Sequence, residues 1–163
     1  MSVSHPPSCS DVKPSILLVE DNVAVQMTLE AYLEKEGFNV IVVDDGQRAL
    51  QKLREISADI RNNVNLVGIV TDQNMGGQGK DGTDFLEQVF PDSKGEATAI
   101  SHEVLNRIKV VIFQSDECDP SKEGGVYDEI KTIGDRITRL GKAFAMFDKH
   151  QELKLIEYLK ANI

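Results

Sequence analysis

The stretch SILLVEDN, residues 15–22, joins an uninterrupted apolar run to two carboxylates and an asparagine. A continuous apolar run of this length is typical of a strand that is covered on both faces. Asn22 can cap a helix, and apolar residues at helical spacing follow as far as Gly37, a residue type that commonly ends helices. The stretch therefore predicts a buried strand that ends in acids and leads directly into a helix.

The same alternation recurs along the chain. Strands are predicted at 15–19, 38–43, 65–71, 108–114 and 136–140, with helices between Asn22 and Gly37 and at 47–56, 83–90, 125–133 and 145–163. Five strands that alternate with five helices predict an α/β fold, with a parallel sheet and helices on both of its faces. Because crossover connections are right-handed, a doubly wound sheet is favoured.

Composition restricts the classes of function. The 163 residues are 40% hydrophobic, which fits one compact domain, and the net charge of -9 argues against nucleic acid as a partner. No apolar run is long enough for a membrane span, and the N-terminus lacks a secretory signal. Residues 1–14 are expected to be a flexible tail. Two cysteines without a metal-site spacing are expected to be free thiols, and the chain is expected to be cytoplasmic.

Polar residues follow four of the predicted strands. They are Glu20 and Asp21 after the first strand, Asp72 after the third, Ser115 after the fourth and Lys142 after the fifth. Because the carboxyl ends of parallel strands share one edge of a sheet, these side chains are expected to converge. Three adjacent carboxylates repel unless a cation joins them, and oxygen ligands favour Mg2+, with Mn2+ as an alternative. A carboxylate in such a site can accept a phosphoryl group, with the hydroxyl and the ammonium contacting its oxygens.

The segments ILLVEDN, TDQNM, VVIFQSDE and RLGKAF occur in an order and spacing that resemble the receiver domain of two-component response regulators, over about 15–163. The resemblance implies a flavodoxin-like (βα)5 fold with strand order 2-1-3-4-5 and Asp72 as the phosphoacceptor. It further implies Asp21 as a direct metal ligand and Glu20 as a ligand mainly through water. The backbone carbonyl of Asn74 would complete the protein ligands.

The resemblance also implies that Ser115 is the switch hydroxyl and Lys142 the lysine that pairs with the phosphoryl group. The implied donor is a sensor histidine kinase or a histidine phosphotransfer protein. Since the predicted closing helix ends the chain, we expect a stand-alone receiver at 15–163 that has no output domain. It would signal by docking to a downstream protein or by phosphorelay. Enzymatic activity is expected only as Mg2+-dependent self-phosphorylation and autodephosphorylation at Asp72.

Four positions depart from the family pattern. Gly76 replaces a proline four residues after Asp72, and Asp116 follows Ser115 where the family has a small residue. Arg139 stands three residues before Lys142, in the place of the switch aromatic, and Ala143 replaces the proline after that lysine. The bond before Ala143 is expected to be trans or a strained cis peptide, and the loop GGQGK (76–80) to be mobile without ligand.

These departures leave other functions open. One is a pseudo-receiver, which would have the same fold and act as a phosphorylation-independent interaction module. Another is a metal-dependent phosphatase, although such enzymes usually carry a second acid where this chain has Asn74. The segment SHEV (101–104) is neither a zinc-protease motif nor a kinase histidine box, and it predicts a surface histidine on a short helix.

Overall fold

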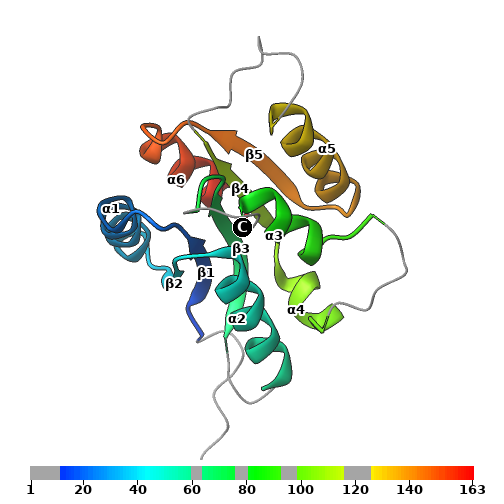
Figure 1. Cartoon of the computed structure of the whole chain (residues 1–163). Coiled ribbons are helices and arrows are strands. Elements are labelled where there is room, and N and C mark those ends of the chain that lie inside the picture. The colour runs from blue at the N-terminus through cyan, green and yellow to red at the C-terminus, as the bar shows by residue number, and fades with distance from the viewer. Residues whose placement is uncertain (1–11, 60–63, 76–80, 93–98, 116–125) are drawn as a thin grey trace, which may run out of the picture.

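A parallel five-stranded sheet forms the centre of the molecule (Figure 1). The computed structural model describes residues 12–59, 64–75, 81–92, 99–115 and 126–163. The strands are β1 (Pro14–Val19), β2 (Asn39–Val43), β3 (Asn65–Asp72), β4 (Val110–Gln114) and β5 (Ala143–Phe147). They lie in the order β2-β1-β3-β4-β5, and every neighbouring pair is parallel. The predicted fold class and strand order are confirmed.

Helices cover both faces of the sheet (Figure 1). They are α1 (Val23–Lys35), α2 (Gly46–Ala58), α3 (Gly82–Val89), α4 (His102–Arg107), α5 (Val126–Arg139) and α6 (Glu152–Ala161). Buried side chains of α1 and α6 form one core with the sheet, and those of α2, α3, α4 and α5 form the other. In the described part of the chain, no helix is long and apolar enough to cross a membrane.

The first strand and helix form as their sequence predicts. Residues 16–19 and 110–113 are fully buried, as expected for strands with helices on both sides. The Asn22 side chain accepts hydrogen bonds from the N–H groups of Ala24 and Val25, which caps α1. After the helix, Gly37 has a φ of 92°, a left-handed conformation that glycine adopts without strain.

The predictions of a strand at 136–140 and of a closing helix that begins at residue 145 were wrong. Residues 136–140 are not a strand, because α5 continues as far as Arg139 with Ile130, Ile133 and Ile137 buried on one face. Their spacing of three and four residues is helical. Gly141, at a φ of 79°, follows the helix, and the apolar run AFAMF forms β5 where a closing helix was predicted to begin. That closing helix is confined to α6.

The short helix predicted around residue 102 is present as α4. The side chain of Ser101 accepts a hydrogen bond from the N–H of Val104 and caps the helix, while His102 is exposed. With α4, the described part of the chain has six helices, one more than the five that were predicted to alternate with the strands.

Candidate functional site

Three carboxylates meet at the carboxyl edge of the sheet. Glu20 and Asp21 follow β1, and Asp72 is the last residue of the neighbouring strand β3. One carboxylate oxygen from each residue lies within 4.8 Å of those of the other two. Glu20 and Asp72 are fully buried, whereas Asp21 is exposed to solvent. The structure thus brings together the acids that the sequence placed at the strand ends.

Glu20 has an unusual environment for a carboxylate. Its Oε1 accepts a hydrogen bond from the N–H of Asn22 at 2.9 Å, but its buried Oε2 has no hydrogen-bond partner among the described residues. Burial raises the pKa of Glu20 from its usual 4.5 to about 7. The charges of Asp72 and Asp21 also raise this pKa, while the Asn22 N–H and Lys149 lower it.

Asp72 is buried among backbone and side-chain hydrogen-bond donors. Its Oδ1 accepts a hydrogen bond from the N–H of Gln73 at 2.7 Å, and its Oδ2 lies 2.9 Å from the ammonium of Lys149. Burial raises the pKa of Asp72, and the contacts with Lys149 and with the N–H groups of Gln73 and Asn74 oppose that rise. The carboxylate is therefore held in place by the backbone on one side and by a lysine on the other.

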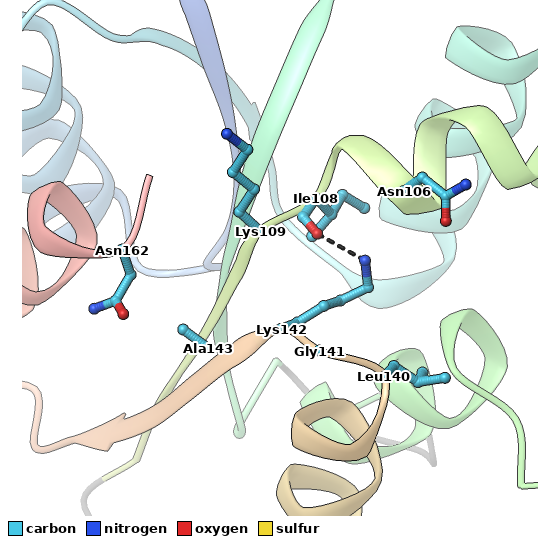
Figure 2. A pocket seen from close by; sticks show the side chains of 8 residues that line it. All are labelled: Asn106, Ile108, Lys109, Leu140, Gly141, Lys142, Ala143 and Asn162. Atoms are coloured by element: carbon cyan, nitrogen blue, oxygen red, sulfur yellow. Dashed lines mark hydrogen bonds between the residues drawn. The ribbon is translucent and has the colours of Figure 1, made fainter.

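Lys142 does not reach this site, which corrects the sequence prediction. It precedes β5 and therefore lies at the amino edge of the sheet, in a pocket that includes Asn106, Lys109 and Asn162 (Figure 2). Its ammonium donates to the carbonyl oxygens of Leu105 at 2.5 Å and Ile108 at 2.7 Å, at the end of α4. Burial lowers its pKa.

The lysine at the carboxylate cluster is Lys149, which sequence reasoning missed. The strand expected at 136–140 ends two residues before Lys142, which led to the wrong assignment. The signal that identifies Lys149 is the apolar run AFAMF, since Lys149 follows its last residue by two positions.

The structural positions of Arg139 and Ala143, which flank Lys142, also differ from those that the sequence predicted. Arg139 is the exposed last residue of α5 and not a strand residue. The residue three positions before Lys149 is Met146, which is half-buried on β5 and paired in register with Phe113. Ala143 is the first residue of β5, and the peptide bond that precedes it is trans.

Ser115 lies at the same edge as the acids. It is buried, follows β4 directly, and its N–H donates to the carbonyl of Phe147 at 3.2 Å. Its neighbour Gln114 is in register with Asp72 on the adjacent strand. Two predictions, on Gly76 with its loop 76–80 and on Asp116, concern positions outside the described residues.

The start of α3 packs closely against Asp72. A Cβ atom at Gly82 would lie 2.2 Å from the carbonyl oxygen of Asp72, so only glycine fits there. The N–H of Gly82 donates to the carbonyl of Gln73 at 3.2 Å. The Gln73 side chain also donates to Asp81 at 3.1 Å and accepts from the N–H of Thr83 at 3.2 Å. These contacts fix the backbone on both sides of the segment 76–80.

The carboxylate cluster fits a hard divalent cation. Two oxygens bound to one Mg2+ ion lie at most about 4.2 Å apart, because each bond is about 2.1 Å long. The spacing of the three oxygens therefore needs only small side-chain adjustments. All three donors are oxygens, and the unpaired Oε2 of Glu20 is available to the ion or to one of its water ligands. Asn74 follows Asp72 by two residues, and its carbonyl stays a predicted ligand.

A family model and several solved structures are similar to this chain. The family model of the response regulator receiver domain matches residues 16–108, more than half of the chain. The comparison with curated proteins found no match. Among solved structures, the chemotaxis protein CheY4 of Vibrio cholerae is 19% identical, with a TM-score of 0.61 over 93% of this chain and 100% of that one.

A second similar structure is the receiver domain of the sensor histidine kinase PA1611 from Pseudomonas aeruginosa, with a magnesium ion coordinated in its active-site cleft. It is 20% identical, with a TM-score of 0.57 over 92% of this chain and 97% of that one. At these identities the likeness shows the fold, and the family follows from the match of the model to the sequence. The chain belongs to the response regulator receiver domain family of two-component signalling.

Proposed function

We propose that the chain accepts a phosphoryl group on Asp72 from a phosphohistidine donor, with Mg2+ bound by the neighbouring acids. The observation that carries the proposal is the position of Asp72. It is a buried carboxylate at the end of a central strand, within 4.8 Å of the carboxylates of Glu20 and Asp21 and 2.9 Å from the ammonium of Lys149. A nucleophile, a cation site and a fixed positive charge are the groups that phosphoryl transfer requires.

The transfer forms one bond and breaks one. A carboxylate oxygen of Asp72 attacks the phosphorus of the phosphohistidine, and the P–N bond breaks as the new P–O bond forms. The imidazole nitrogen keeps the electron pair of the broken bond and takes up a proton from water. In the later hydrolysis of the aspartyl phosphate, water attacks the phosphorus, and Asp72 leaves as a carboxylate. Inorganic phosphate and a proton are released.

The residues around Asp72 have distinct tasks in this proposal. Asp21, Asp72 and the carbonyl of Asn74 would hold the ion directly, and Glu20 would hold it mainly through water. When bound, Mg2+ supplies positive charge to the phosphoryl oxygens. Lys149 takes the role that the sequence assigned to Lys142, since its ammonium already lies against Asp72 and can pair with the phosphoryl group. Ser115 would donate a hydrogen bond to another phosphoryl oxygen.

Receiver domains work with histidine kinases, so a histidine kinase or a histidine phosphotransfer protein is the proposed donor. The phosphoryl group adds negative charge and acceptor oxygens, which can bias a two-state surface through Ser115 and β5. Met146 stands on β5 three residues before Lys149. Because methionine is flexible and apolar, we propose that it repacks beside Ser115 and transmits the change to a docking partner or to the next protein of a phosphorelay.

The test is incubation of the native chain with Mg2+ and a small phosphodonor, beside an Asp72→Asn variant. We expect the mass of one phosphoryl group to be added to the native chain only, and to be lost on treatment with chelator and base. If the folded native chain acquires no adduct and binds no beryllofluoride, the pseudo-receiver is the better description. Sustained phosphate release from varied monoesters would instead indicate a phosphatase.

A further inference from the structure

A row of polar side chains crosses the sheet beside Asp72. The strand register sets Asp72 directly opposite Gln114 on β4. It also pairs Val19 with Thr71, so that Glu20, the residue after β1, comes next to Asp72. Side chains alternate between the faces of a strand. Leu18, Val70 and Ile112, each two residues earlier, belong to the core under α1 and α6. Glu20, Asp72 and Gln114 therefore lie on the same side of the sheet, at the ends of three adjacent strands.

Gln114 carries a buried side-chain amide. Its side chain is fully buried, and neither Oε1 nor Nε2 has a hydrogen-bond partner in the part of the chain that the structure describes. Buried polar atoms are almost always satisfied, and leaving them unpaired is costly. The next residue in the row is Phe147, which is apolar and offers the amide no side-chain partner. A group that binds between Asp72 and Gln114 would satisfy it.

We propose that the side-chain amide of Gln114 is a further binding residue of this site and donates a hydrogen bond to a phosphoryl oxygen on Asp72. This inference rests on the proposed function of Asp72. Side chains at opposed positions run alongside each other, on strands about 4.8 Å apart. Because glutamine is one methylene longer than aspartate, an extended Gln114 side chain would bring its amide level with a group attached to the Asp72 carboxylate. A phosphoryl oxygen is a strong acceptor at that position.

A neutral amide is a suitable hydrogen-bond donor beside the metal-binding carboxylates. A neutral donor adds no charge that would compete with the cation for the carboxylates, as a second lysine or arginine would. In the structure, the ammonium of Lys149 pairs with Oδ2 of Asp72. Once the phosphoryl group is attached, the ammonium and the amide can each contact a different phosphoryl oxygen. Gln114 would thus contribute to the stability of the phosphorylated state and leave the metal site unchanged.

The test compares Gln114→Met, which keeps the length of the side chain and removes the amide, with Ile112→Val as a matched control. Ile112 is buried two residues earlier on the same face of β4. The readouts are the affinity for beryllofluoride at saturating Mg2+ and the midpoint of chemical unfolding. Gln114→Met is expected to unfold at the same or a higher denaturant concentration, because two unpaired polar atoms are removed. Its affinity is expected to fall about tenfold, the effect of one hydrogen bond to a charged group.

Three outcomes overturn the proposal. Unchanged beryllofluoride affinity in Gln114→Met, and in Gln114→Leu as a second apolar variant, would show that the amide does not contact the phosphoryl group. Equal losses in Ile112→Val and Gln114→Met would show that the effect is packing alone. If the native chain itself neither binds beryllofluoride nor is phosphorylated, the proposed function fails and this proposal fails with it. A Gln114→Asn variant, which keeps a shortened amide, is expected to lie between the native chain and Gln114→Met.

Discussion

The ammonium of Lys149 lies 2.9 Å from Oδ2 of Asp72, which joins the segment after β5 to the end of β3 across the carboxyl edge of the sheet. The Lys149 side chain is 18% exposed and that of Asp72 is 0% exposed, so solvent screens the pair only weakly. Removing one partner of such a pair leaves the other as an uncompensated buried charge. Lys149 therefore affects both the protonation of Asp72 and its capacity to hold an anionic ligand.

Replacing Lys149 with methionine is expected to weaken beryllofluoride binding by about tenfold or more, since a charge-assisted contact to the anion is lost. Lys142→Met is the matched control. It removes the hydrogen bonds to the carbonyls of Leu105 and Ile108 and is expected to lower the free energy of unfolding by about 1–3 kcal/mol. Its affinity for beryllofluoride is expected to be unchanged. The reverse pattern, with binding lost only in Lys142→Met, would contradict the assignment of Lys149.

The contrast between these lysines shows what could be predicted from the sequence. The strands that end in Glu20 and Asp72 are continuous apolar runs, so their ends, and the acids at them, could be located by pattern alone. Around Lys142 the residues RITRL look apolar enough for a strand in isolation. The helical spacing that extends back to Ile130, with Gly141 after it, assigns residues 136–139 to α5 and leaves the apolar run AFAMF for the strand.

Other features depend on tertiary structure and have no local signal. The position of the Gln114 amide opposite Asp72, with no hydrogen-bond partner among the described residues, follows only once β4 is placed in register beside β3. Similarly, the need for glycine at position 82 follows from the close approach of α3 to the Asp72 carbonyl. Neither feature changes the period or the propensity of its segment, so neither could be predicted before the strands and helices were packed together.

Mg2+ is expected to stabilise the folded chain, because the carboxylate cluster exists only in the folded state. At a concentration of about 100 times the dissociation constant, binding would add about 2.7 kcal/mol to the free energy of unfolding. Asp21→Asn is expected to lose most of this gain, while Asp135→Asn, an exposed carboxylate on α5, is expected to keep it. Denaturation with and without Mg2+ measures the difference. Equal gains in the two variants would argue against a cation at the cluster.

Glu20 is expected to make the metal-free chain less stable as the pH rises. Its pKa is about 7 in the folded chain and near 4.5 when unfolded. Below pH 4.5 the group is protonated in both states, and its contribution to stability is complete. Between these values only the unfolded chain releases the proton, so the folded state loses stability until about pH 7.

The comparison with Glu20→Gln isolates this effect, because glutamine does not titrate. Between pH 4.5 and about 7, the free energy of unfolding of the native chain should fall on the order of 3 kcal/mol relative to the variant, since one pKa unit corresponds to about 1.4 kcal/mol. Saturating Mg2+ should remove the fall, because cation binding favours the deprotonated carboxylate. Parallel pH profiles of the two metal-free proteins would contradict the raised pKa.

Gly82→Ala is expected to disrupt the site through the backbone. The added Cβ would lie 2.2 Å from the carbonyl oxygen of Asp72, so α3 and the end of β3 must separate. We expect a loss of at least about 2 kcal/mol in the free energy of unfolding, as in other overpacked sites. We also expect beryllofluoride binding to be lost, because the Asp72 backbone moves.

Gly141→Ala provides the control for Gly82→Ala. Gly141 has a φ of 79° at the opposite edge of the sheet, and a Cβ there would meet no atom within 4 Å. This variant should lose about 1–3 kcal/mol through backbone strain alone and keep its beryllofluoride affinity. If Gly82→Ala also kept its affinity while losing stability, the close approach of α3 would be a packing feature that does not position Asp72.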